Sequence, residues 1–410
     1  MKILVVTNLF SPDRGGGASV FSDMCFGLAE RGHEVTVYTT YPYYPEWKNK
    51  AGTSAWRTLR ETVRGVDVHR YGMFIPRDPK RLLTRVPYEL SFAISLLRSL
   101  FHFRKHDVVM VYCPMPGAVL YSSIRKLFYR EPLWLNVQDI PADAAAASGM
   151  SRSKLFNRFG LAVQSWLFNR GDVWSTIAPA MVVRLNSIRK RDQPVHYCPN
   201  FLNGTMADAI EEHAGKPPRS QGGPLRLLYA GNIGKKQGLR AFCKSLNKTD
   251  LAFHFRIHGN GADAEVVKDW VEQSGGDRFE FGDFLGEEEF VAALMESDFF
   301  VITEKAGVGA SFVPSKLIPC IATGTPLLCV CDQEGPLGCE VSEFQLGISV
   351  SWPQIESLSS RIESALAKEK SLAEMQANAL RRSKFYSRKN VIDKFELELK
   401  RTSGYESSAD

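Results

Sequence analysis

The first forty residues combine a buried-strand pattern, a run of three glycines and an amphipathic helix. Ile3–Val6 is a short apolar run rich in β-branched residues, which predicts a fully buried strand. Apolar residues recur at helical spacing over Ala18–Glu30, and Glu34–Thr39 predicts a second strand. Strand, helix and strand in this order form a βαβ unit, which places the two strands in a parallel sheet. The opening segment therefore restricts the chain to an α/β fold.

The three glycines, Gly15–Gly17, lie between the first strand and the helix. This is the carboxyl edge of a parallel sheet, where α/β proteins bind their ligands. Glycines there let a phosphate approach the backbone, and the helix N-terminus offers unpaired N–H groups to it. A loop that only needs flexibility is the alternative explanation, and it stays open on the glycines alone. The spacing is not G-x-G-x-x-G, so a nicotinamide-type fingerprint is not supported.

Strand, loop and helix alternate through the rest of the chain. Further strands are predicted at Val108–Tyr112, Leu133–Val137, Trp174–Ile177, His196–Cys198, Leu225–Tyr229, Phe253–Ile257, Phe279–Phe281, Asp298–Thr303 and Pro326–Cys331. The pattern is interrupted by the polar, turn-rich segment His213–Pro224, and 410 residues are too many for one ordinary core. We expect two doubly wound Rossmann-like domains that face a cleft. The expected boundaries are a first domain at 1–205, a linker at 206–224, a second domain at 225–384, and a helix with a tail at 385–410 that returns to the first domain.

Composition excludes several classes of protein. The eight cysteines are scattered and form no C-x-x-C pair, which favours reduced buried thiols over a metal site or a disulfide framework. No apolar run reaches about 18 residues, the length that would predict a transmembrane helix. No signal peptide is recognisable at the N-terminus. Nucleic acid is not an expected partner, because no recognised binding module is present.

One segment combines positive charge with an apolar helical face. The window 77–106 is rich in lysine and arginine, with cations at both ends of the stripe formed by Leu90, Ala93, Ile94, Leu97, Leu100 and Phe101. Phe92, Leu96 and Phe103 broaden this stripe. A basic amphipathic helix can lie in the interface of an anionic bilayer, so residues 80–105 are a predicted peripheral membrane contact. An ordinary core helix with solvated ends is the alternative.

The predicted strand ends carry polar groups suited to a diphosphate. Gly231, Gly234 and Gly238 alternate with Lys235 and Lys236 after a strand, and backbone amides together with lysine bind phosphates. A second cation, Lys316, follows Ser315 on a loop that leads into a helix. In the first half, Asp139 follows a strand and can accept a proton or bind a hydroxyl. One domain that binds a nucleotide diphosphate and another that binds an acceptor would permit group transfer.

Three segments together resemble a known enzyme family. They are the opening "SPDRGGGAS…LAERGHEVTVYT", "LLYAGNIGKKQGL" and "FVPSKLIPCIATGTPLL", which are similar to bacterial GT-B glycosyltransferases of the retaining GT4 type. "YPYYPEW", "VQDIPADAAAASGM" and "GNIGKKQG" resemble the branch of colanic acid, capsule and O-antigen (exopolysaccharide) transferases. The resemblance extends over nearly the whole chain.

The resemblance implies roles for individual residues. Gly16 and Gly17 would approach the donor phosphate and the acceptor. The further donor-binding residues would be Gly231, Asn232, Lys236, Gln237, Gly309, Ser315 and Lys316. Many relatives carry an arginine and a lysine on the diphosphate, and these two positions are Asn232 and Gln237 here.

Two glutamates of the family are missing from this chain. The positions where relatives often carry them, eight residues apart, are Ser311 and Pro319. Glu304 is the nearest carboxylate that could act in their place, and Asp139 and Glu304 are the candidate catalytic residues.

The resemblance also implies an activity. It predicts transfer of a hexosyl or N-acetylhexosaminyl group from a nucleotide diphosphate sugar to a polyprenyl-diphosphate-linked or other saccharide acceptor, with retention of configuration. No cofactor and no metal are expected. The location would be cytoplasmic, at the inner face of the plasma membrane. Two alternatives remain, namely a sugar-nucleotide 2-epimerase of similar fold, and a non-catalytic sugar-nucleotide-binding partner.

Overall fold

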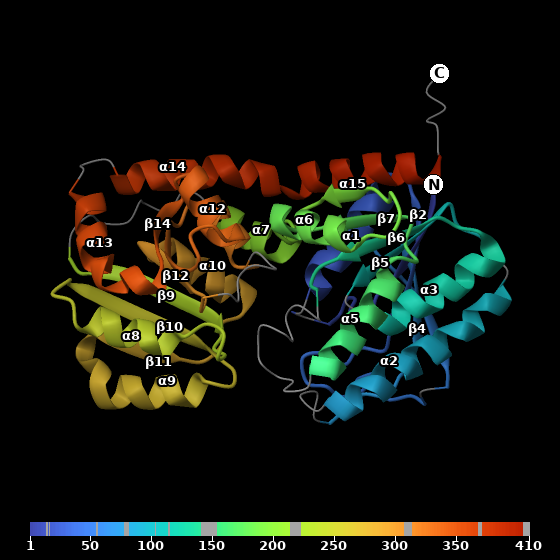
Figure 1. The fold of residues 1–410 in the computed structure, drawn as a ribbon, viewed down its shortest axis with the longest axis horizontal. Helices are drawn as coiled ribbons and strands as arrows, with labels where there is room; N and C mark the ends of the chain where they lie inside the picture. Colours follow the sequence, from blue (N-terminus) through green and yellow to red (C-terminus); the bar gives the residue numbers. More distant parts are fainter. Residues whose placement is uncertain are drawn as a thin grey trace, which may run out of the picture. The chain divides into compact units, whose positions relative to one another are not determined.

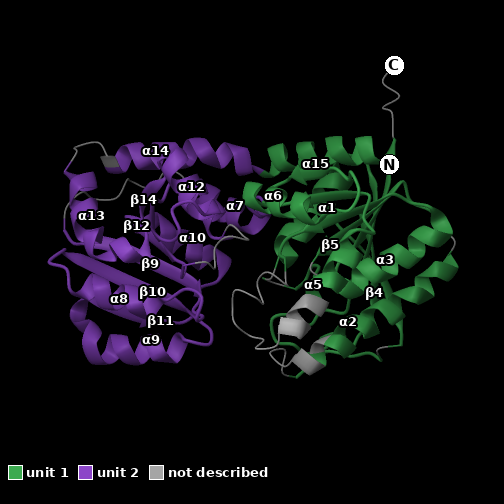
Figure 2. Cartoon of the chain, in the orientation of Figure 1, with its two compact units in different colours: residues 1–200, 388–410 green, residues 201–387 purple. Residues whose placement is uncertain are grey.

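The structure is a computed structural model of the 410-residue chain. It describes residues 1–13, 15, 17–54, 56–77, 82–102, 104–113, 115–140, 154–213, 223–306, 314–367 and 371–404. The chain divides into two compact units, coloured separately in Figure 2. Unit 1 comprises Met1–Asn200 and Arg388–Asp410, and unit 2 comprises Phe201–Ser387.

Unit 1 is built on a mostly parallel sheet (Figure 1). Its strands are β1 (Lys2–Val6), β2 (Glu34–Thr40), β3 (Thr58–Val63), β4 (Val66–Tyr71), β5 (Val108–Cys113), β6 (Leu133–Val137), β7 (Val173–Thr176) and β8 (Val195–Tyr197). Within the described residues they form eight strands in the order β3-β4-β2-β1-β5-β6-β7-β8. All neighbours are parallel except β3 and β4, which are antiparallel.

The helices of unit 1 follow the strands. They are α1 (Ala18–Glu30), α2 (Leu82–Leu97), α3 (Pro116–Tyr129), α5 (Lys154–Phe168), α6 (Pro179–Ile188) and α15 (Arg388–Ser403), with a 3-10 segment at Arg98–His102. The α15 helix returns to unit 1 and packs on α1, as expected from the sequence. Gly27 permits this contact, because a Cβ at this position would lie 2.2 Å from Ile392 Cδ1. Ion pairs from Arg31 to Asp393 and from Arg388 to Glu30 flank the packed residues.

Unit 2 repeats the same design with a wholly parallel sheet. Its strands are β9 (Leu225–Asn232), β10 (Phe253–Asn260), β11 (Phe279–Gly282), β12 (Phe299–Thr303), β13 (Leu327–Val330) and β14 (Gly347–Val350). In the described part of unit 2 the order is β11-β10-β9-β12-β13-β14. The α-helices are α7 (Gly204–Glu212), α8 (Leu239–Asn247), α9 (Ala264–Trp270), α10 (Glu287–Glu296), α11 (Leu317–Ala322), α12 (Pro336–Glu343), α13 (Leu358–Leu366) and α14 (Ser371–Ser383). Shorter helical segments are Val271–Gly275, Gly276–Arg278, Trp352–Ser357 and Lys384–Tyr386.

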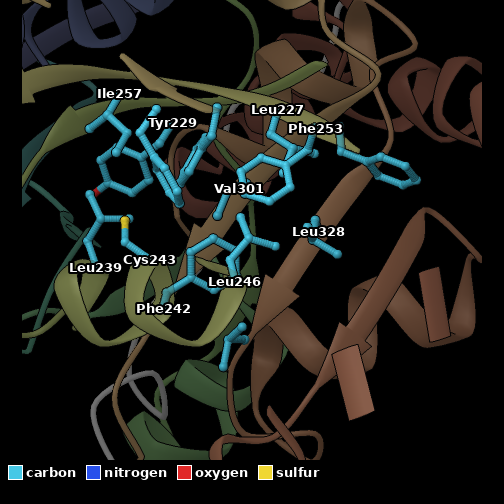
Figure 3. Packing of buried hydrophobic residues seen from close by; sticks show 14 of the residues in the cluster. Leu227, Tyr229, Leu239, Phe242, Cys243, Leu246, Phe253, Ile257, Val301 and Leu328 are labelled. Atoms are coloured by element: carbon cyan, nitrogen blue, oxygen red, sulfur yellow. The ribbon is translucent and has the colours of Figure 1, made fainter. Parts of the chain in front are cut away.

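One face of the unit 2 sheet is covered by α8, and Figure 3 shows the packing. The helix presents Leu239, Phe242, Cys243 and Leu246 to the sheet, at the i, i+3, i+4 and i+7 spacing of an amphipathic helix. Buried strand residues meet them, and those labelled in Figure 3 are Leu227, Tyr229, Phe253, Ile257, Val301 and Leu328. This packing fixes β9, β10 and β12 as a rigid support for the loops at their carboxyl ends.

The fold class predicted from the sequence is confirmed, and three elements differ from expectation. The sequence analysis predicts no strand for the hairpin Thr58–Tyr71. Its edge strand β3 has no buried residue, whereas β4 is buried at all but one position and is missed although it is a core strand. The short strand Gly347–Val350 is also additional. The expected linker begins inside a helix: α7 covers Gly204–Glu212, with Asn203 as its N-cap and Ala209 buried.

The apolar stripe predicted for residues 80–105 is divided between two faces of α2. Phe92, Ala93 and Leu96 are buried in unit 1, whereas Leu90, Ile94 and Phe101 are exposed. The buried half of the stripe belongs to the core of unit 1, because α2 packs on α3 and β4, and the membrane contact stays a prediction for the exposed half. Lys80, Arg81 and Phe103 lie outside the described residues. Within the described part of the chain, no helix combines the length and apolar character that crossing a bilayer requires.

Candidate active site

The sheet of unit 2 has a topological switch point between β9 and β12. From β9 the chain progresses outward through β10 and β11, and from β12 it progresses the other way through β13 and β14. In open α/β sheets the crevice at such a point, at the carboxyl ends of the strands, is the usual ligand site. Gly231 and Asn232 end β9, and Glu304 directly follows β12. The fold therefore brings two sequence-predicted segments to one ligand-binding position.

Lys316 lies directly over Gly231. The glycine has φ of 139°, and a Cβ at this position would lie 2.5 Å from Lys316 Cε and 2.9 Å from its Nζ. The ammonium group also lies 4.6 Å from the ring centroid of Phe290 on α10. None of the carboxylates that the structure describes forms an ion pair with Lys316, and burial lowers its pKa. The bare glycine leaves room for the lysine side chain, and a cation in this environment is stabilised by an anionic ligand.

The strand ends beside Gly231 are also bare backbone. Gly259 pairs with Gly231 across β9 and β10, and a Cβ on Gly259 would lie 1.9 Å from the Gly231 carbonyl oxygen. Asn232 is exposed next to this pair, and its carbonyl accepts a hydrogen bond from the Tyr229 hydroxyl at 2.7 Å. Because Asn232 is exposed, its side chain can face solvent or a ligand at the end of the strand.

The loop between β9 and α8 is closed by its own hydrogen bonds. Gly234 N–H donates to Gln237 Oε1 at 3.0 Å, so the Gln237 amide oxygen shapes the loop. The carbonyl of Lys236 accepts from Lys305 N–H at 2.8 Å, which ties the loop to the segment after β12. Lys236 is partly exposed and Lys235 is exposed.

Glu304 is a buried carboxylate with an unsatisfied oxygen. Its side chain is 6% exposed, and its Oε1 has no hydrogen-bond partner. Burial, together with the nearby charge of Asp332, raises the pKa of Glu304 to about 7. The backbone is held on both sides, because its N–H donates to Val330 O at 2.8 Å and its carbonyl accepts from Trp352 Nε1 at 2.6 Å. An unpaired carboxyl of this kind at a switch point is a candidate for recognising a hydroxyl or N–H group.

The two positions that lack the family glutamates differ in what the structure describes. Pro319 is buried within α11, where its ring packs in the core beside Ile318 and Cys320. Ser311 and Gly309 lie outside the described residues. Ser315 is exposed in the turn that precedes α11.

Unit 1 has its own switch point, between β1 and β5. Gly17 is the N-cap of α1 with φ of 94°, and a Cβ there would lie 2.7 Å from the Phe21 ring. Gly15 has φ of 78°, and its carbonyl accepts from Ala18 N–H at 3.0 Å. The glycines thus make the tight turn into α1 after β1. Gly16 lies outside the described residues.

Sequence reasoning did not identify the residues that hold this loop. Asp13 is buried and its Oδ1 accepts from the N–H groups of Tyr43 and Tyr44, at 2.9 and 3.0 Å. Burial is the largest influence on its carboxyl and raises the pKa of Asp13 above the ordinary value. The signal that could have found this contact is the density of aromatic residues in "YPYYPEW", directly after β2.

An aromatic cluster lies beside the loop between β1 and α1, which Asp13 connects to Tyr43 and Tyr44. Tyr43, Tyr44, Trp47 and Tyr88 lie with ring centroids between 5.5 and 6.4 Å apart. The hydroxyls of Tyr43 and Tyr88 are hydrogen-bonded at 2.7 Å, and Asn8 Nδ2 donates to both. Tyr43 and Tyr88 are buried, whereas Tyr44 and Trp47 are partly exposed, so the latter two rings are the ones suited to contact a sugar ring.

Asp139 lies at the carboxyl end of β6, three strands from β2. It is partly buried, and its Oδ1 accepts from Ile140 N–H at 2.8 Å. The predicted site residues therefore fall into two sets: Gly231, Lys236, Glu304 and Lys316 surround the switch point of unit 2, whereas Gly17 and Asp139 belong to the sheet edge of unit 1. Among the described residues, no group of three or more His, Cys, Asp or Glu side chains could hold a metal ion.

Comparison with known families identifies both units. Residues 15–200 match the model of the glycosyl transferase 4-like domain, and residues 211–382 match that of glycosyl transferases group 1. The chain belongs to the GT4-type glycosyltransferases. The chain is also 27% identical over 382 residues to WcaI of Escherichia coli (strain K12), which is described as a colanic acid biosynthesis glycosyl transferase. The match covers 89% of this chain and 92% of WcaI.

Solved structures show the same architecture. Sucrose-phosphate synthase from Thermosynechococcus elongatus matches with a TM-score of 0.75 and 14% identity, over 99% of this chain and 100% of that one. Anabaena Alr3699/HepE in complex with UDP-glucose matches with a TM-score of 0.66 and 14% identity, over 98% and 100% of the two chains. The glycosyltransferase therefore has the GT-B fold, as the sequence resemblance implies.

Proposed function

We propose that this glycosyltransferase transfers a sugar from a nucleotide diphosphate sugar to a saccharide acceptor during assembly of a cell-surface polysaccharide. The similarity to WcaI and to a HepE structure that contains UDP-glucose supports this class of reaction. The observation that carries the proposal is the ammonium of Lys316 over Gly231, at the switch point of unit 2 and without a carboxylate partner among the described residues. A diphosphate is the ligand that this cation and the bare strand end fit best.

Lys236 would supply a second charge to the diphosphate. Its loop is tied to the segment after β12, so the two cations approach the switch point from different strands. Asn232 and Gln237, which stand where many relatives have cationic residues, would contribute polar contacts and loop shape. The positive charge of this site is thereby carried by Lys316 and Lys236. Ser315, and Gly309 from outside the described residues, would complete the donor pocket.

Glu304 would replace the missing glutamates in recognising the donor. Its unsatisfied oxygen is a buried acceptor at the β12 end of this site, next to the Thr303 hydroxyl, which also lacks a hydrogen-bond partner. A hydroxyl of the donor ribose or sugar that donates to this oxygen would satisfy it. Pro319 cannot serve, since it has no polar side chain and lies in the α11 core.

Unit 1 would bind the acceptor. Its glycine turn, the aromatic cluster of Tyr43, Tyr44, Trp47 and Tyr88, and Asp139 all lie at the carboxyl edge of its sheet. Stacking on the partly exposed rings of Tyr44 and Trp47 would hold a sugar ring, and Asp139 would accept a hydrogen bond from its hydroxyl. The hexosyl or N-acetylhexosaminyl identity of the transferred group would follow from contacts around Glu304.

We propose transfer with retention and without a metal. The bond between the sugar carbon C1 and the diphosphate oxygen breaks, the acceptor oxygen bonds to C1 from the same face, and the acceptor proton passes to the departing phosphate. The protein then contributes position and positive charge, and little acid–base chemistry of its own. The cations of unit 2 would stabilise the charge that develops on the diphosphate.

The acceptor is proposed to be lipid-linked, with the enzyme bound peripherally at the cytoplasmic face of the membrane. The support is the exposed face of α2, where Val86, Leu90, Ile94 and the following Phe101 are between 46 and 77% exposed. Soluble proteins rarely leave an apolar stripe of this kind uncovered unless it is an interaction site. Lys105 and Arg104 are exposed at its far end.

Nucleotide binding tests the donor site directly. Titration calorimetry with UDP, GDP and ADP would identify the base, and Lys316→Met should weaken the preferred nucleotide by about ten- to hundredfold, because a charge-assisted contact contributes about 1.5–3 kcal/mol. Lys268→Met, which changes an exposed lysine on α9, is the matched control. Unchanged affinity in Lys316→Met would refute the donor site. Release of a changed sugar nucleotide without any acceptor would instead identify a 2-epimerase.

A further inference from the structure

A strongly basic groove lies on unit 1, away from the carboxyl edge of its sheet. It has a volume of about 640 Å³ and lies where α3, α5 and α6 end. Its lining includes Lys126, Arg130, Arg170, Lys190 and Arg191, together with the exposed ring of Trp166. Each of these helices ends just before a strand, so the groove is at the amino edge of the sheet. The donor and acceptor sites proposed above do not use it.

Most of the charge in the groove is uncompensated. Lys126 forms an ion pair with Asp172, at 2.6 Å between Nζ and Oδ2. No described carboxylate forms an ion pair with Arg130, Arg170 or Lys190. Three helix carboxyl ends meet here, and their partial negative charge offsets part of the positive charge. The side chains, and not the helix dipoles, therefore make the groove attractive to an anion.

The groove is also pre-formed. Asn169 joins the end of α5 to the turn after α6: its Nδ2 donates to Ile188 O at 3.2 Å, and its Oδ1 accepts from Lys190 N–H at 2.7 Å. Arg191 Nη2 donates to the carbonyls of Asn169 and Gly171, at 2.7 and 3.0 Å. The Arg170 guanidinium lies 4.3 Å from the ring centroid of Trp166. The cations are thus carried by a fixed backbone, and little order is lost when a ligand binds.

Apolar side chains surround this charge. Leu127 and Phe128 on α3 are 78 and 70% exposed, and Trp166 on α5 is 47% exposed. The helix α3 packs against both α2 and α5, so the three helices form one layer (Figure 1). The exposed stripe of α2 belongs to that same layer. Tryptophan and cations beside exposed aliphatic groups are the side chains that favour the interface of a bilayer.

We propose that this groove binds the phosphate headgroup of an anionic phospholipid. The inference rests on the proposed membrane contact of α2 and adds a headgroup site to it. A lipid fits better than a free anion, because it would place its phosphate among Arg130, Arg170 and Lys190 while its chains meet Leu127, Phe128 and Trp166. Two contacts on one helix layer, one apolar and one cationic, would fix the rotation of unit 1 on the membrane.

Vesicle binding by the full chain tests this site. Co-sedimentation would compare vesicles of phosphatidylcholine alone with vesicles that also contain phosphatidylglycerol. The test variant is Arg130→Gln/Arg170→Gln/Lys190→Gln, which leaves the ion pair of Lys126 and the backbone contacts of Arg191 intact. We expect its affinity for the anionic vesicles to fall by about a hundredfold, because each cation near an anionic surface contributes about 1 kcal/mol to binding.

The matched control removes the same charge from unit 2. Lys244→Gln/Lys248→Gln/Lys268→Gln changes three exposed lysines on or beside α8 and α9 and should retain most of the anionic-vesicle binding. Equal losses in the two triple variants would show that net charge alone attracts the protein, and would overturn the groove. Unchanged nucleotide binding confirms that the test variant is folded and keeps this outcome separate from the donor site.

The remaining outcomes separate the groove from the α2 contact. Anionic-vesicle binding that survives in the test variant but is lost in Leu90→Ser/Ile94→Ser would overturn the groove and leave the α2 contact standing. Wild-type protein that binds no vesicle would overturn both. Inorganic phosphate at matched ionic strength should compete weakly. A third outcome is a saturable thermal shift with phosphate that is absent in the test variant, while vesicle binding is the same in both proteins. This outcome would identify a site for free phosphate and would overturn the proposal of a lipid site.

Discussion

The two units share one architecture but place their buried charges differently. In unit 1, Arg125 and Glu131 are both 1% exposed and form an ion pair of 2.7 Å, with His106 N–H donating to the same carboxylate. In unit 2, Glu304 is buried and Lys316 is partly buried, and neither side chain has such a partner among the described residues. A paired buried charge is part of the core, whereas an unpaired charge at a switch point is a candidate for binding a ligand. The comparison therefore distinguishes the structural ion pair of unit 1 from the groups of unit 2 that we propose for donor binding.

The two units also differ in their surfaces. Exposed large apolar residues of unit 1 include six on the α2, α3 and α5 layer, namely Val86, Leu90, Ile94, Leu127, Phe128 and Trp166, and others elsewhere, such as Trp56, Phe74 and Val183. In the described part of unit 2 they are scattered, at Val266, Phe284, Leu380 and Phe385. Single exposed apolar residues are normal on any protein, but a contiguous set on one layer indicates an interaction surface. Unit 1 is thus the unit expected to meet the membrane.

The largest expected effect comes from breaking the paired charge. Glu131→Ala should lower the free energy of unfolding by about 3–5 kcal/mol, because it leaves the Arg125 guanidinium buried and uncompensated. Chemical denaturation would measure the change. Lys316→Met should leave stability unchanged or higher, since the burial that lowers the pKa of Lys316 is a cost that methionine removes. Similar destabilisation by both substitutions would contradict the proposed difference between the paired charge of Arg125 and the unpaired charge of Lys316.

The next effect concerns the apolar face of α2. Leu90→Ser/Ile94→Ser should weaken vesicle binding by about a hundredfold or more, because full burial of each aliphatic side chain is worth about 1.5–3 kcal/mol. Val266→Ser/Phe284→Ser, which alters exposed apolar residues of unit 2, is the control. If the control weakens vesicle binding as much as the α2 variant does, the surface contrast between the units has no functional meaning.

A smaller effect is expected from the ionisation of Glu304. Its folded pKa of about 7 is above the ordinary glutamate value of 4.5, so the folded state binds more protons than the unfolded state between these pH values. The free energy of unfolding should therefore fall as pH rises from about 4.5 through 7, and Glu304→Gln should remove this slope. Urea titrations across this pH range would measure it.

The same group should tune donor affinity. A carboxylate accepts a hydroxyl hydrogen bond more strongly than a neutral carboxyl does, so nucleotide-sugar affinity should rise by about fivefold as Glu304 ionises. Calorimetry at several pH values would compare wild type with Glu304→Gln, in which the nucleotide's own titration remains as the reference. Parallel pH profiles of affinity for the two proteins would show that Glu304 does not contact the donor.

The smallest expected effect is that of a chelator. Turnover should persist in excess EDTA, because the proposed site stabilises the diphosphate with Lys316 and Lys236. Product release from radiolabelled donor, with and without EDTA, is the measurement. Complete loss that magnesium or manganese restores would show that the two cations are not sufficient.

Much of the fold could be predicted because it depends on local pattern. The β-branched run Ile3–Val6 and the helical spacing of Ala18–Glu30 are properties of adjacent residues, and both elements form where predicted. The strand β3 was not predicted because an exposed edge strand carries little apolar signal, whereas the buried strand β4 was missed for no such reason. Gly65 is the sequence signal of the turn between them, where both Arg64 and Gly65 have positive φ.

The sequence by itself determined the alternation of strands and helices, and with it the class of fold and the edge where ligands bind. Only the tertiary structure decided which polar groups lose water. The burial of Glu304, the position of Lys316 over Gly231 and the division of the α2 stripe all depend on packing between segments far apart in the chain. The basic groove likewise joins Arg130, Arg170 and Lys190 from three helix ends. Periodicity records what neighbouring residues prefer, whereas burial and charge pairing arise from contacts between distant residues that no local pattern contains.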